Sequence, residues 1–483
     1  MTMVELTVKS LREKLDKKEV SARELTQAYL DRIESVDKKV ESYITVTPEA
    51  ALSAADKAQE KINAGEASSL CGIPLAIKDN ICTEGVKTTC ASRMLENFVP
   101  PYNATVMDKL ENEGIVMLGK TSMDEFAMGG STQTSAFAKT KNPYDLTRVP
   151  GGSSGGSAAA VGADLCAAAL GSDTGGSIRQ PAAFCGVTGI KPTYGRVSRY
   201  GLVAFASSLD QIGPVARSAE DCGIILNAIS GYDFHDGTSS RLPVDDYTSK
   251  IGMSMKGVKI AVVSEFFAEG VDENVRKSVL AAVDTYKAMG AEIIEASMPS
   301  LKYAIAAYYL IASAEASSNL SRYDGIKFGH RADVGGSYND LIVASRSEGF
   351  GDEVKRRILL GNYALSSGYY DAYYGKAMGL KQKIREEYAD IFTKCDLIIT
   401  PTAPSVAYGI NENISDPKKM YQADFCTVTV NIASLPALST TCGYDENGMP
   451  IGMSIVGKMW DETTIIGAAD AFEKQFDRIG ASL

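Results

Sequence analysis

The chain has 483 residues, of which 49 are Lys or Arg and 60 are Asp or Glu, for a formal net charge of −11. This acidic balance argues against direct, nonspecific binding of nucleic acid, because a phosphate backbone is held by clustered positive charge. A hydrophobic fraction of 45% and a charged fraction of 23% are ordinary for a globular protein and exclude a disordered or collagen-like chain. Only two histidines occur, His235 and His330, which disfavours His-rich metal ligation and an imidazole relay.

The cysteines and the apolar segments indicate where the protein works. Nine cysteines are an odd number, and none stands in a C-x-x-C pair, so we expect reduced thiols and no zinc ribbon. The first residues lack the pattern of a secretion signal. The most apolar stretch, 304–314, spans about 11 residues, whereas a bilayer crossing needs about 20. We therefore expect a cytoplasmic protein without membrane contact.

The first 65 residues are predicted to be helical. Ser21 followed by Glu24 is a capping-box pattern that begins an amphipathic helix. Another helix is predicted to begin with Pro48 at its first position and to end just before Gly65.

Beyond residue 72, short apolar runs alternate with helical patterns, which indicates α/β organisation around a buried sheet. We find no internal repeat and no long low-complexity linker, so one compact unit over 1–483 is favoured. The expected strands are 73–77, 115–118, 258–263, 292–295, 397–400 and 451–456, and the expected helices are 104–113, 273–289 and long helices within 352–394.

Residues 149–177 are dense in Gly, Ser and Ala, with the blocks Gly151–Ser157 and Gly171–Ser177. Such density is rarely needed for a core, so we expect it to serve chemistry. The aspartic-protease pattern Asp173-Thr-Gly lacks the second carboxylate motif that this chemistry requires. The pattern G-x-S-x-G around Ser153 and Ser154 follows an apparent loop, 142–150, and finds no histidine in a catalytic setting.

A P-loop expression, G-x-x-x-x-G-K-T, also matches at 114–121. Its four variable positions are large and apolar, so they belong to a strand, whereas a phosphate loop should follow the strand. ATP binding at this segment is therefore disfavoured.

A hydroxyl-rich site without an imidazole needs another base, and Lys78 is the best candidate. It directly follows an apolar strand, where partial burial can lower the pKa of an amine. The alternative, which position alone favours, is a lysine at the end of a strand that extends to solvent.

Lys78, Gly151-Gly-Ser-Ser-Gly-Gly-Ser157 and Asp173-Thr-Gly-Gly-Ser-Ile-Arg-Gln-Pro181 together resemble the amidase signature family. The resemblance implies one α/β domain with a mixed central sheet covered by helices. It divides the chain into a helical N-terminal segment, 1–65, a signature core, 72–200, and a remainder, 201–483, with the other strands, helices and the substrate pocket.

The same resemblance implies a Ser-Ser-Lys triad. Ser177 would be the nucleophile, Ser153 the bridging serine after a cis peptide bond at Gly152-Ser153, and Lys78 the base. Asp173 and Arg179 are expected to form a supporting ion pair. The glycine-rich turn suits an oxyanion hole built from Thr174, Gly175, Gly176 and Ser177. Supporting places behind the triad are expected for Asp79, Ser154 and Ser157.

Four further segments resemble the glutaminase subunits of tRNA-dependent amidotransferases within this family, and the likeness covers nearly the whole chain. It implies hydrolysis of glutamine to supply ammonia for amidation of Glu-tRNA(Gln) on a partner. Subunits B and C would complete a heterotrimer. ATP and Mg²⁺ would be bound by the partner, which would also hold most of the tRNA, and this chain would bind no cofactor and no metal. The segments are Gly119–Gly129, Lys191–Gly201, Ala314–Ser321 and Glu353–Gly361.

For glutamine itself, the resemblance places Arg357 on the carboxylate, Asp424 on the ammonium group and Tyr308 at a further polar contact. Position alone favours a different interpretation, in which Glu353 and Arg357 form an i,i+4 ion pair on a helix surface. A stand-alone amidase of small or aryl amides is the alternative activity, and it would need a more apolar pocket. A pseudoenzyme scaffold is disfavoured by the intact triad.

Overall fold

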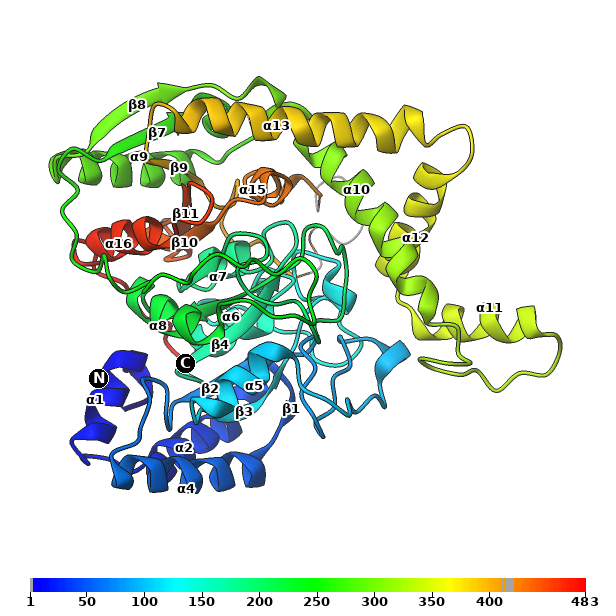
Figure 1. Ribbon diagram of the computed structural model, residues 1–483, viewed down its shortest axis with the longest axis horizontal. Coiled ribbons are helices and arrows are strands. Elements are labelled where there is room, and N and C mark those ends of the chain that lie inside the picture. The colour runs from blue at the N-terminus through cyan, green and yellow to red at the C-terminus, as the bar shows by residue number, and fades with distance from the viewer. Residues whose placement is uncertain (1–2, 269, 411, 413–420) are drawn as a thin grey trace.

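One mixed sheet runs through the molecule in the order β1-β3-β2-β4-β6-β5-β10-β11-β9-β7-β8 (Figure 1). The computed structural model describes residues 3–268, 270–410, 412 and 421–483. Pairs within β3-β2-β4 and β9-β7-β8 are parallel and the other pairs are antiparallel. The strands are β1 Tyr43–Val46, β2 Pro74–Lys78, β3 Val116–Thr121, β4 Ala168–Asp173, β5 Thr188–Lys191, β6 Gln211–Ala216, β7 Lys259–Val263, β8 Glu292–Ala296, β9 Leu397–Pro401, β10 Ala437–Tyr444 and β11 Pro450–Gly457.

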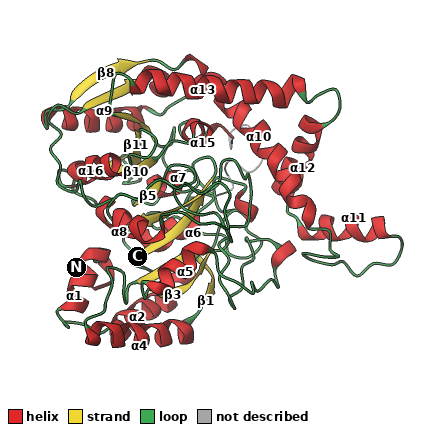
Figure 2. Ribbon diagram, viewed as in Figure 1, coloured by secondary structure: helices red, strands yellow, loops and turns green. Residues whose placement is uncertain are grey.

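Helices surround this sheet (Figure 2), which confirms the predicted α/β fold with a mixed central sheet. The predicted strands and helices are each found within a few residues of their expected bounds. The helices are α1 Val8–Asp16, α2 Ala22–Arg32, α3 Lys38–Val40, α4 Pro48–Ala64, α5 Thr105–Asn112, α6 Gly155–Gly162, α7 Arg179–Phe184, α8 Ala219–Ile229, α9 Glu273–Ala288, α10 Ala304–Asn319, α11 Tyr338–Gly349, α12 Asp352–Leu365, α13 Lys376–Phe392, α15 Val428–Ala433 and α16 Glu462–Glu473.

The N-terminal helices begin and end where their signals lie. Ser21 caps α2 with a complete capping box, in which Glu24 returns the hydrogen bond. Pro48 is the first residue of α4, and Gly65 ends it in the left-handed conformation with φ 76°. Local capping chemistry therefore predicts these helix ends well. The prediction that the first 65 residues are all helical is wrong, because Tyr43–Val46 form strand β1, which pairs with β3.

Two neighbouring parallel strands carry the triad region. β2 pairs with β4 in parallel, so the carboxyl ends of both strands meet at one edge of the sheet. Lys78 ends β2 and Asp173 ends β4. In open α/β sheets, this edge is where binding and catalytic groups gather.

The Gly/Ser/Ala-dense segment 149–177 lies in the interior, although such density is rarely needed for a core. Nearly every residue of this segment is buried. A Cβ atom on Gly152 would lie 2.0 Å from Asp124 Oδ2, and one on Gly156 would lie 2.3 Å from the Ser122 carbonyl oxygen. The small residues therefore let two loops and a helix pack more closely than ordinary side chains allow.

The most apolar stretch of the chain lies in α10, which is buried within the molecule. Ile311, Ala312 and Ala316 have no exposed surface and belong to the core that α10 shares with α12 and α13. In the part of the chain that the structure describes, no helix has the length and apolar character needed to span a membrane.

Candidate active site

Lys78 is completely buried, so the alternative of a lysine extending to solvent is wrong. Its ammonium nitrogen lies 2.8 Å from Ser153 Oγ and 2.8 Å from Ser154 Oγ. It also lies 3.0 Å from Ser172 Oγ and 3.2 Å from the Ser172 carbonyl oxygen. The hydrogen-bond partners of the amine are thus three serine hydroxyls and one backbone carbonyl, all of them uncharged.

These surroundings shift the pKa of Lys78 from 10.5 to about 7. Burial is the main cause, because it disfavours the charged ammonium. The carboxylates of Asp124, Asp173 and Asp210 oppose the shift. A large fraction of Lys78 is therefore the neutral amine near pH 7, the form that can accept a proton.

The two serines approach the lysine from the glycine-rich segment. The Gly152-Ser153 peptide bond is cis, which confirms that expectation. The N–H of Ser154 donates to the Ser177 carbonyl at 3.0 Å, so the two serine-bearing turns lie side by side. Ser177 is 8% exposed, whereas Ser153 and Lys78 are 0% exposed. Ser177 is thus the member of the set that an incoming molecule can reach.

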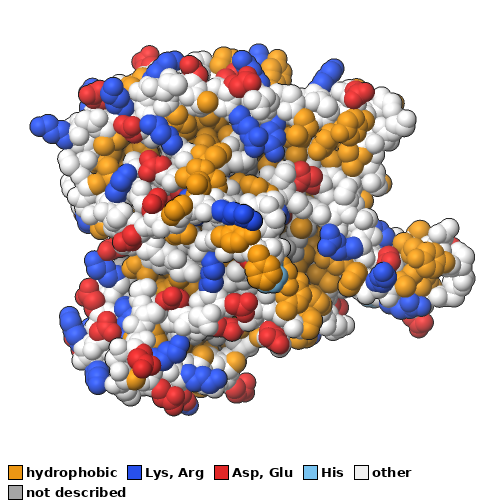
Figure 3. Space-filling model, in the orientation of Figure 1, with side chains coloured by type: hydrophobic (Ala, Val, Ile, Leu, Met, Phe, Trp, Pro, Cys, Tyr) orange, Lys and Arg blue, Asp and Glu red, His pale blue; other side chains and the backbone are white. Residues whose placement is uncertain are grey.

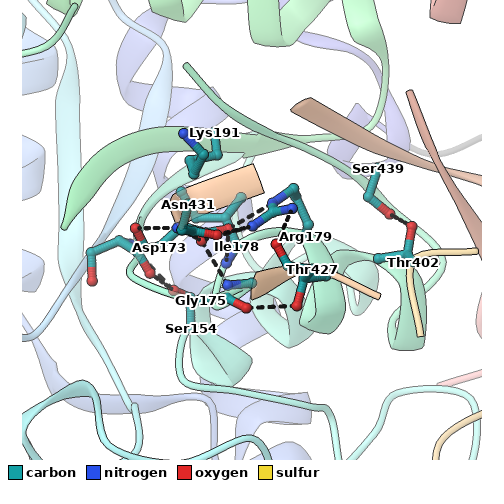
Figure 4. A network of polar contacts seen from close by, with 12 residues as sticks. Ser154, Asp173, Gly175, Ile178, Arg179, Lys191, Thr402, Thr427, Asn431 and Ser439 are labelled. Carbon is teal, nitrogen blue, oxygen red and sulfur yellow. Dashed lines mark hydrogen bonds and ion pairs between the residues drawn. The ribbon is translucent and has the colours of Figure 1, made fainter. Parts of the chain in front are cut away.

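A buried ion pair holds the turn that carries Ser177 (Figure 4). Asp173 accepts from Arg179 Nε at 3.0 Å and Nη2 at 3.1 Å, and neither side chain is exposed, which confirms the expected pair. Asp173 also accepts the N–H groups of Gly176 at 2.7 Å and Ile178 at 3.2 Å. Asn431 donates to the same carboxylate at 2.8 Å.

Burial alone would raise the pKa of Asp173, but the Arg179 guanidinium outweighs it, with help from Lys191 and Asn431, and holds that pKa below its usual range. Arg179 in turn donates to Asn431 Oδ1 at 2.5 Å and to the Thr427 carbonyl at 3.3 Å. The carboxylate is therefore a permanent acceptor that fixes the shape of the turn.

One of the four expected oxyanion-hole donors has another partner. Gly176 has φ 133°, which requires glycine, and its N–H is the one that donates to Asp173. The candidate donors toward a substrate oxygen are therefore the N–H groups of Thr174, Gly175 and Ser177.

The pocket residues lie next to this turn. Thr427 Oγ1 donates to the Gly175 carbonyl at 2.6 Å and approaches the Asp424 carbonyl at 3.2 Å. A Cβ atom on Gly175 would lie 2.4 Å from Cζ of Tyr308, so the glycine packs directly against this ring. Asp424 and Tyr308 are thus within one or two contacts of the Ser177 turn.

Arg357 and Glu353 form an ion pair in the interior, so the interpretation as a surface pair is wrong. Arg357 Nε donates to Glu353 Oε1 at 2.7 Å, and the side chains are 3% and 6% exposed. The guanidinium carbon lies 5.0 to 5.7 Å from the ring centres of Phe205, Tyr309 and Tyr421. Aromatic faces and a carboxylate together hold a buried positive charge.

Asp424 receives a hydrogen bond of 2.5 Å from the Tyr309 hydroxyl. Burial raises the pKa of Asp424 to about 6, against the lowering effects of Tyr309 and Arg357. Tyr308, by contrast, stands edge-on to Tyr309, with ring centres 5.0 Å apart. The two adjacent tyrosines therefore have different contacts: Tyr308 packs against Gly175, and Tyr309 donates a hydrogen bond to Asp424.

Several supporting residues escape the sequence analysis. Ser154, expected to lie behind the triad, contacts Lys78 as closely as Ser153 does. Ser172 immediately precedes Asp173 in a block already singled out, and that position is the only signal for it. The sequence holds no comparable signal for Tyr309, Thr427 and Asn431.

The two histidines and the P-loop pattern have ordinary structural roles. His235 lies beside Asp233 at 3.0 Å, and His330 beside Glu348 at 2.8 Å, with both rings at the surface. Lys120 of the P-loop pattern lies within β3, and its buried amine donates to Thr83 and other oxygens of the 81–88 loop. These positions agree with the rejection of an imidazole mechanism and of a phosphate loop.

Comparisons with known proteins agree with this site. The Amidase family model matches residues 24–466. The chain is 58% identical to the A subunit of the glutamyl-tRNA(Gln) amidotransferase of Caldanaerobacter subterraneus subsp. tengcongensis, over 99% of this chain and 97% of that protein. It is also 58% identical to the protein of that name from Ruminiclostridium cellulolyticum, over 99% and 98%.

Solved structures give the same result. The crystal structure of the glutamyl-tRNA(Gln) amidotransferase A subunit from Thermotoga maritima superposes with a TM-score of 0.82 at 40% identity, covering 100% of this chain and 99% of that one. The native peptide amidase of Stenotrophomonas maltophilia superposes with a TM-score of 0.83 at 28% identity, covering 99% and 98%. The chain therefore belongs to the amidase family, in the group of the glutamyl-tRNA(Gln) amidotransferase A subunits.

Proposed function

We propose that this chain is the glutaminase subunit of a glutamyl-tRNA(Gln) amidotransferase. The observation that carries the proposal is the presence of two opposite charges, Arg357 and Asp424, on either side of the Tyr309 side chain, whose ring faces the guanidinium and whose hydroxyl bonds the carboxylate. A free amino acid presents a carboxylate and an ammonium group, and this pocket offers a partner for each. The names of the relatives support the same substrate, since glutamine is the usual source of an amide nitrogen.

In the first step, Ser177 Oγ attacks the carboxamide carbon of glutamine. Its proton passes to Ser153 Oγ as the Ser153 proton passes to the neutral amine of Lys78. The carbonyl oxygen becomes an oxyanion, which the N–H groups of Thr174, Gly175 and Ser177 stabilise. The 2.8 Å contact between Lys78 and Ser153 supports this route for the proton.

In the second step, the C–N bond breaks, and the proton held by Lys78 returns through Ser153 to the leaving nitrogen. Ammonia departs and a glutamyl ester remains on Ser177. Water then attacks the ester, with Lys78 again accepting the proton through Ser153, and glutamate leaves as Ser177 regains its proton. The sum is glutamine plus water giving glutamate plus ammonia.

Substrate selection belongs to the pocket. Arg357 uses one N–H for Glu353, and its guanidinium carries four more donors for the substrate carboxylate. Asp424 would take the ammonium group, and Tyr308 would add a polar contact. The pKa of Asp424 near 6 leaves it mostly ionised at neutral pH, which suits this role.

The rest of the reaction would belong to partners. We assign ATP, Mg²⁺ and most of the tRNA contact to subunits B and C of a cytoplasmic heterotrimer, and no cofactor to this chain. Basic and acidic side chains are interspersed on the face seen in Figure 3, and the net charge is −11. Such a surface supports a division of labour in which another subunit grips the nucleic acid.

The decisive experiment measures ammonia released from glutamine by this chain alone and then with its co-purifying partners, ATP and misacylated tRNA. We expect release from glutamine in the complex, coupled to formation of Gln-tRNA(Gln). Hydrolysis of simple or aryl amides without hydrolysis of glutamine would instead support a stand-alone amidase. Testing Asp-tRNA(Asn) beside Glu-tRNA(Gln) would identify the acceptor.

A further inference from the structure

A short turn after β3 touches both halves of the site. The turn consists of Asp124, Glu125 and Phe126, whose side chains are at most 3% exposed. Phe126 and Ala127 have φ values of 49° and 62°, an uncommon left-handed backbone for residues other than glycine. The two consecutive carboxylates of the turn contact different parts of the molecule.

Asp124 contacts the loop of the bridging serine. Its N–H donates to the Ser153 carbonyl at 3.2 Å. Its carboxylate accepts from the Ser131 N–H at 3.1 Å and from Thr134 Oγ1 at 2.9 Å. The missing side chain of Gly152 leaves the space that Asp124 Oδ2 occupies. Asp124 therefore ties the turn to the triad.

Glu125 contacts the start of α12, the helix that carries Arg357. Its two oxygens accept the N–H of Gly351, the N-cap residue of α12, at 2.9 and 3.1 Å. Ser92 Oγ donates to the same carboxylate at 2.5 Å and also to the Gly349 carbonyl at 3.2 Å. A Cβ atom on Gly351 would lie 2.3 Å from Glu125 Oε2, so glycine makes this approach possible.

This arrangement suits a helix N-terminus, where unpaired N–H groups and the helix dipole favour a carboxylate. The ring of Phe126 adds an edge-on contact with Phe350, at 5.6 Å between ring centres, just before the helix begins. Arg357 lies one and a half turns further along the same helix. A shift of the first turn would therefore move the guanidinium.

We propose that Glu125 is a positioning residue for recognition of the substrate carboxylate: it fixes the start of α12 and so the place of Arg357 relative to Ser153. Because Asp124 and Glu125 are adjacent, one turn sets the spacing between the reacting group and the amino-acid pocket. This inference rests on the proposed function, since it concerns binding of an amino acid.

The test uses the complete complex with Glu125→Ala and Glu125→Gln. We expect Glu125→Ala to raise the KM for glutamine about tenfold or more while kcat changes less than about threefold, because geometry and not chemistry is lost. Activity toward propionamide, which has neither charged group, should stay within about twofold. Glu125→Gln keeps one acceptor for Gly351 and should show a smaller rise, and it carries the test if the Ala variant fails to fold.

Asp221→Ala is a matched control. Asp221 is a buried carboxylate that accepts the N–H groups of Val8 and Lys9 at 3.0 and 3.2 Å, at the start of α1. Replacing Asp221 removes the same kind of contact, a carboxylate at the start of a helix, but at α1, which is distant in the sequence from the pocket residues. We expect Asp221→Ala to lower thermal stability and leave the KM for glutamine unchanged.

An unchanged KM for glutamine in both Glu125 variants would overturn the inference, as would an equal loss toward glutamine and propionamide. The proposed function fails separately if the wild-type complex releases no ammonia from glutamine. Even then, hydrogen exchange reports directly on the contact between Glu125 and the start of α12. Glu125→Ala should speed amide exchange in the first turn of α12, and unchanged exchange would show that Glu125 does not stabilise this turn.

Discussion

Two buried basic side chains of this molecule, Lys78 and Arg357, differ in their protonation near neutral pH. Lys78 lies among serine hydroxyls, and its pKa falls to about 7. Arg357 lies against the carboxylate of Glu353 and three aromatic rings and stays protonated. Burial disfavours the positive charge of both side chains. The guanidinium keeps its proton because its own pKa is very high, and Glu353 reinforces the charge, whereas the amine of Lys78 among neutral hydroxyls loses much of its charge. One region is thereby suited to chemistry and the other to recognition.

The two regions also differ in how the chain assembles them. The triad comes from strand ends and turns between residues 78 and 177, at the edge where β2 and β4 end. The pocket comes from α10, α12 and Asp424 just before α15, which lie far apart in the sequence, and α10 packs against both α12 and α15. The triad residues thus come from one continuous part of the sequence, whereas the pocket residues come from segments that are far apart in it.

The largest effect should come from Ser177→Ala. Removing the nucleophile should lower ammonia release from glutamine on the order of 10⁴-fold or more, because the other groups act only through it. Thermal stability should be preserved, since the substitution removes only one hydroxyl from a small side chain. Mass spectrometry of the glutamine-treated wild type should find the glutamyl ester on the Ser177 peptide. An adduct on Ser153 or on a cysteine would reassign the nucleophile.

Lys78→Ala should lower the rate about a thousandfold, or about 4 kcal/mol of transition-state stabilisation. Lys78→Arg should fail as well, because a guanidinium stays protonated near neutrality. The neutral amine is the active form, so kcat/KM of the wild type should rise with pH through about 7 and level off above it. A pH–rate profile measures this limb directly.

The controls for this prediction are His235→Ala and His330→Ala. Both imidazoles lie at the surface, each beside a carboxylate outside the triad, so ammonia release should be nearly unchanged. Collapse of activity in either variant, or near-normal turnover of Lys78→Arg, would exclude Lys78 as the base.

Arg357→Ala tests the recognition side of the comparison. Losing the buried guanidinium should raise the KM for glutamine about 100-fold, as expected for one charged partner of a buried pair. Hydrolysis of propionamide should be spared, because it has no carboxylate. Parallel losses toward both substrates would mean that Arg357 supports the fold and not the pocket.

Tyr309→Phe should have the smallest effect. Its hydroxyl lowers the pKa of Asp424 through their hydrogen bond, so removing it raises that pKa above about 6. More of Asp424 is then protonated near neutrality and holds an ammonium group poorly. We expect a rise of about tenfold in the KM for glutamine, larger at pH 6.5 than at pH 8. A rise that does not depend on pH would contradict this route.

Local signals account for most of what the sequence predicts. The capping box of Ser21 and the apolar runs of the strands depend on neighbouring residues, and they are found where expected. The resemblance to the amidase family brings Lys78 and Ser153 to one place, and the structure places them 2.8 Å apart.

The missing parts depend on long-range packing. Position alone favours a surface pair for Glu353 and Arg357, because i,i+4 spacing carries no information about what covers the helix. Thr427 and Asn431 reach the nucleophile turn from about 250 residues away in the chain, and no spacing rule links them to it. The close packing that the buried glycines allow is likewise visible only in the structure, from the atoms that an added Cβ would contact.

The contacts of Thr427 and Asn431 with the nucleophile turn bear on when the protein becomes active during its synthesis. A ribosome completes the signature segment well before it adds these two residues, at about 5–20 residues per second. Until then the Asp173 and Arg179 pair lacks the Asn431 amide, and Gly175 lacks the Thr427 hydroxyl. A nascent chain therefore carries all three triad residues before it has the support that shapes their turn. The contacts that support the nucleophile turn are therefore completed only when nearly the whole polypeptide has been synthesised.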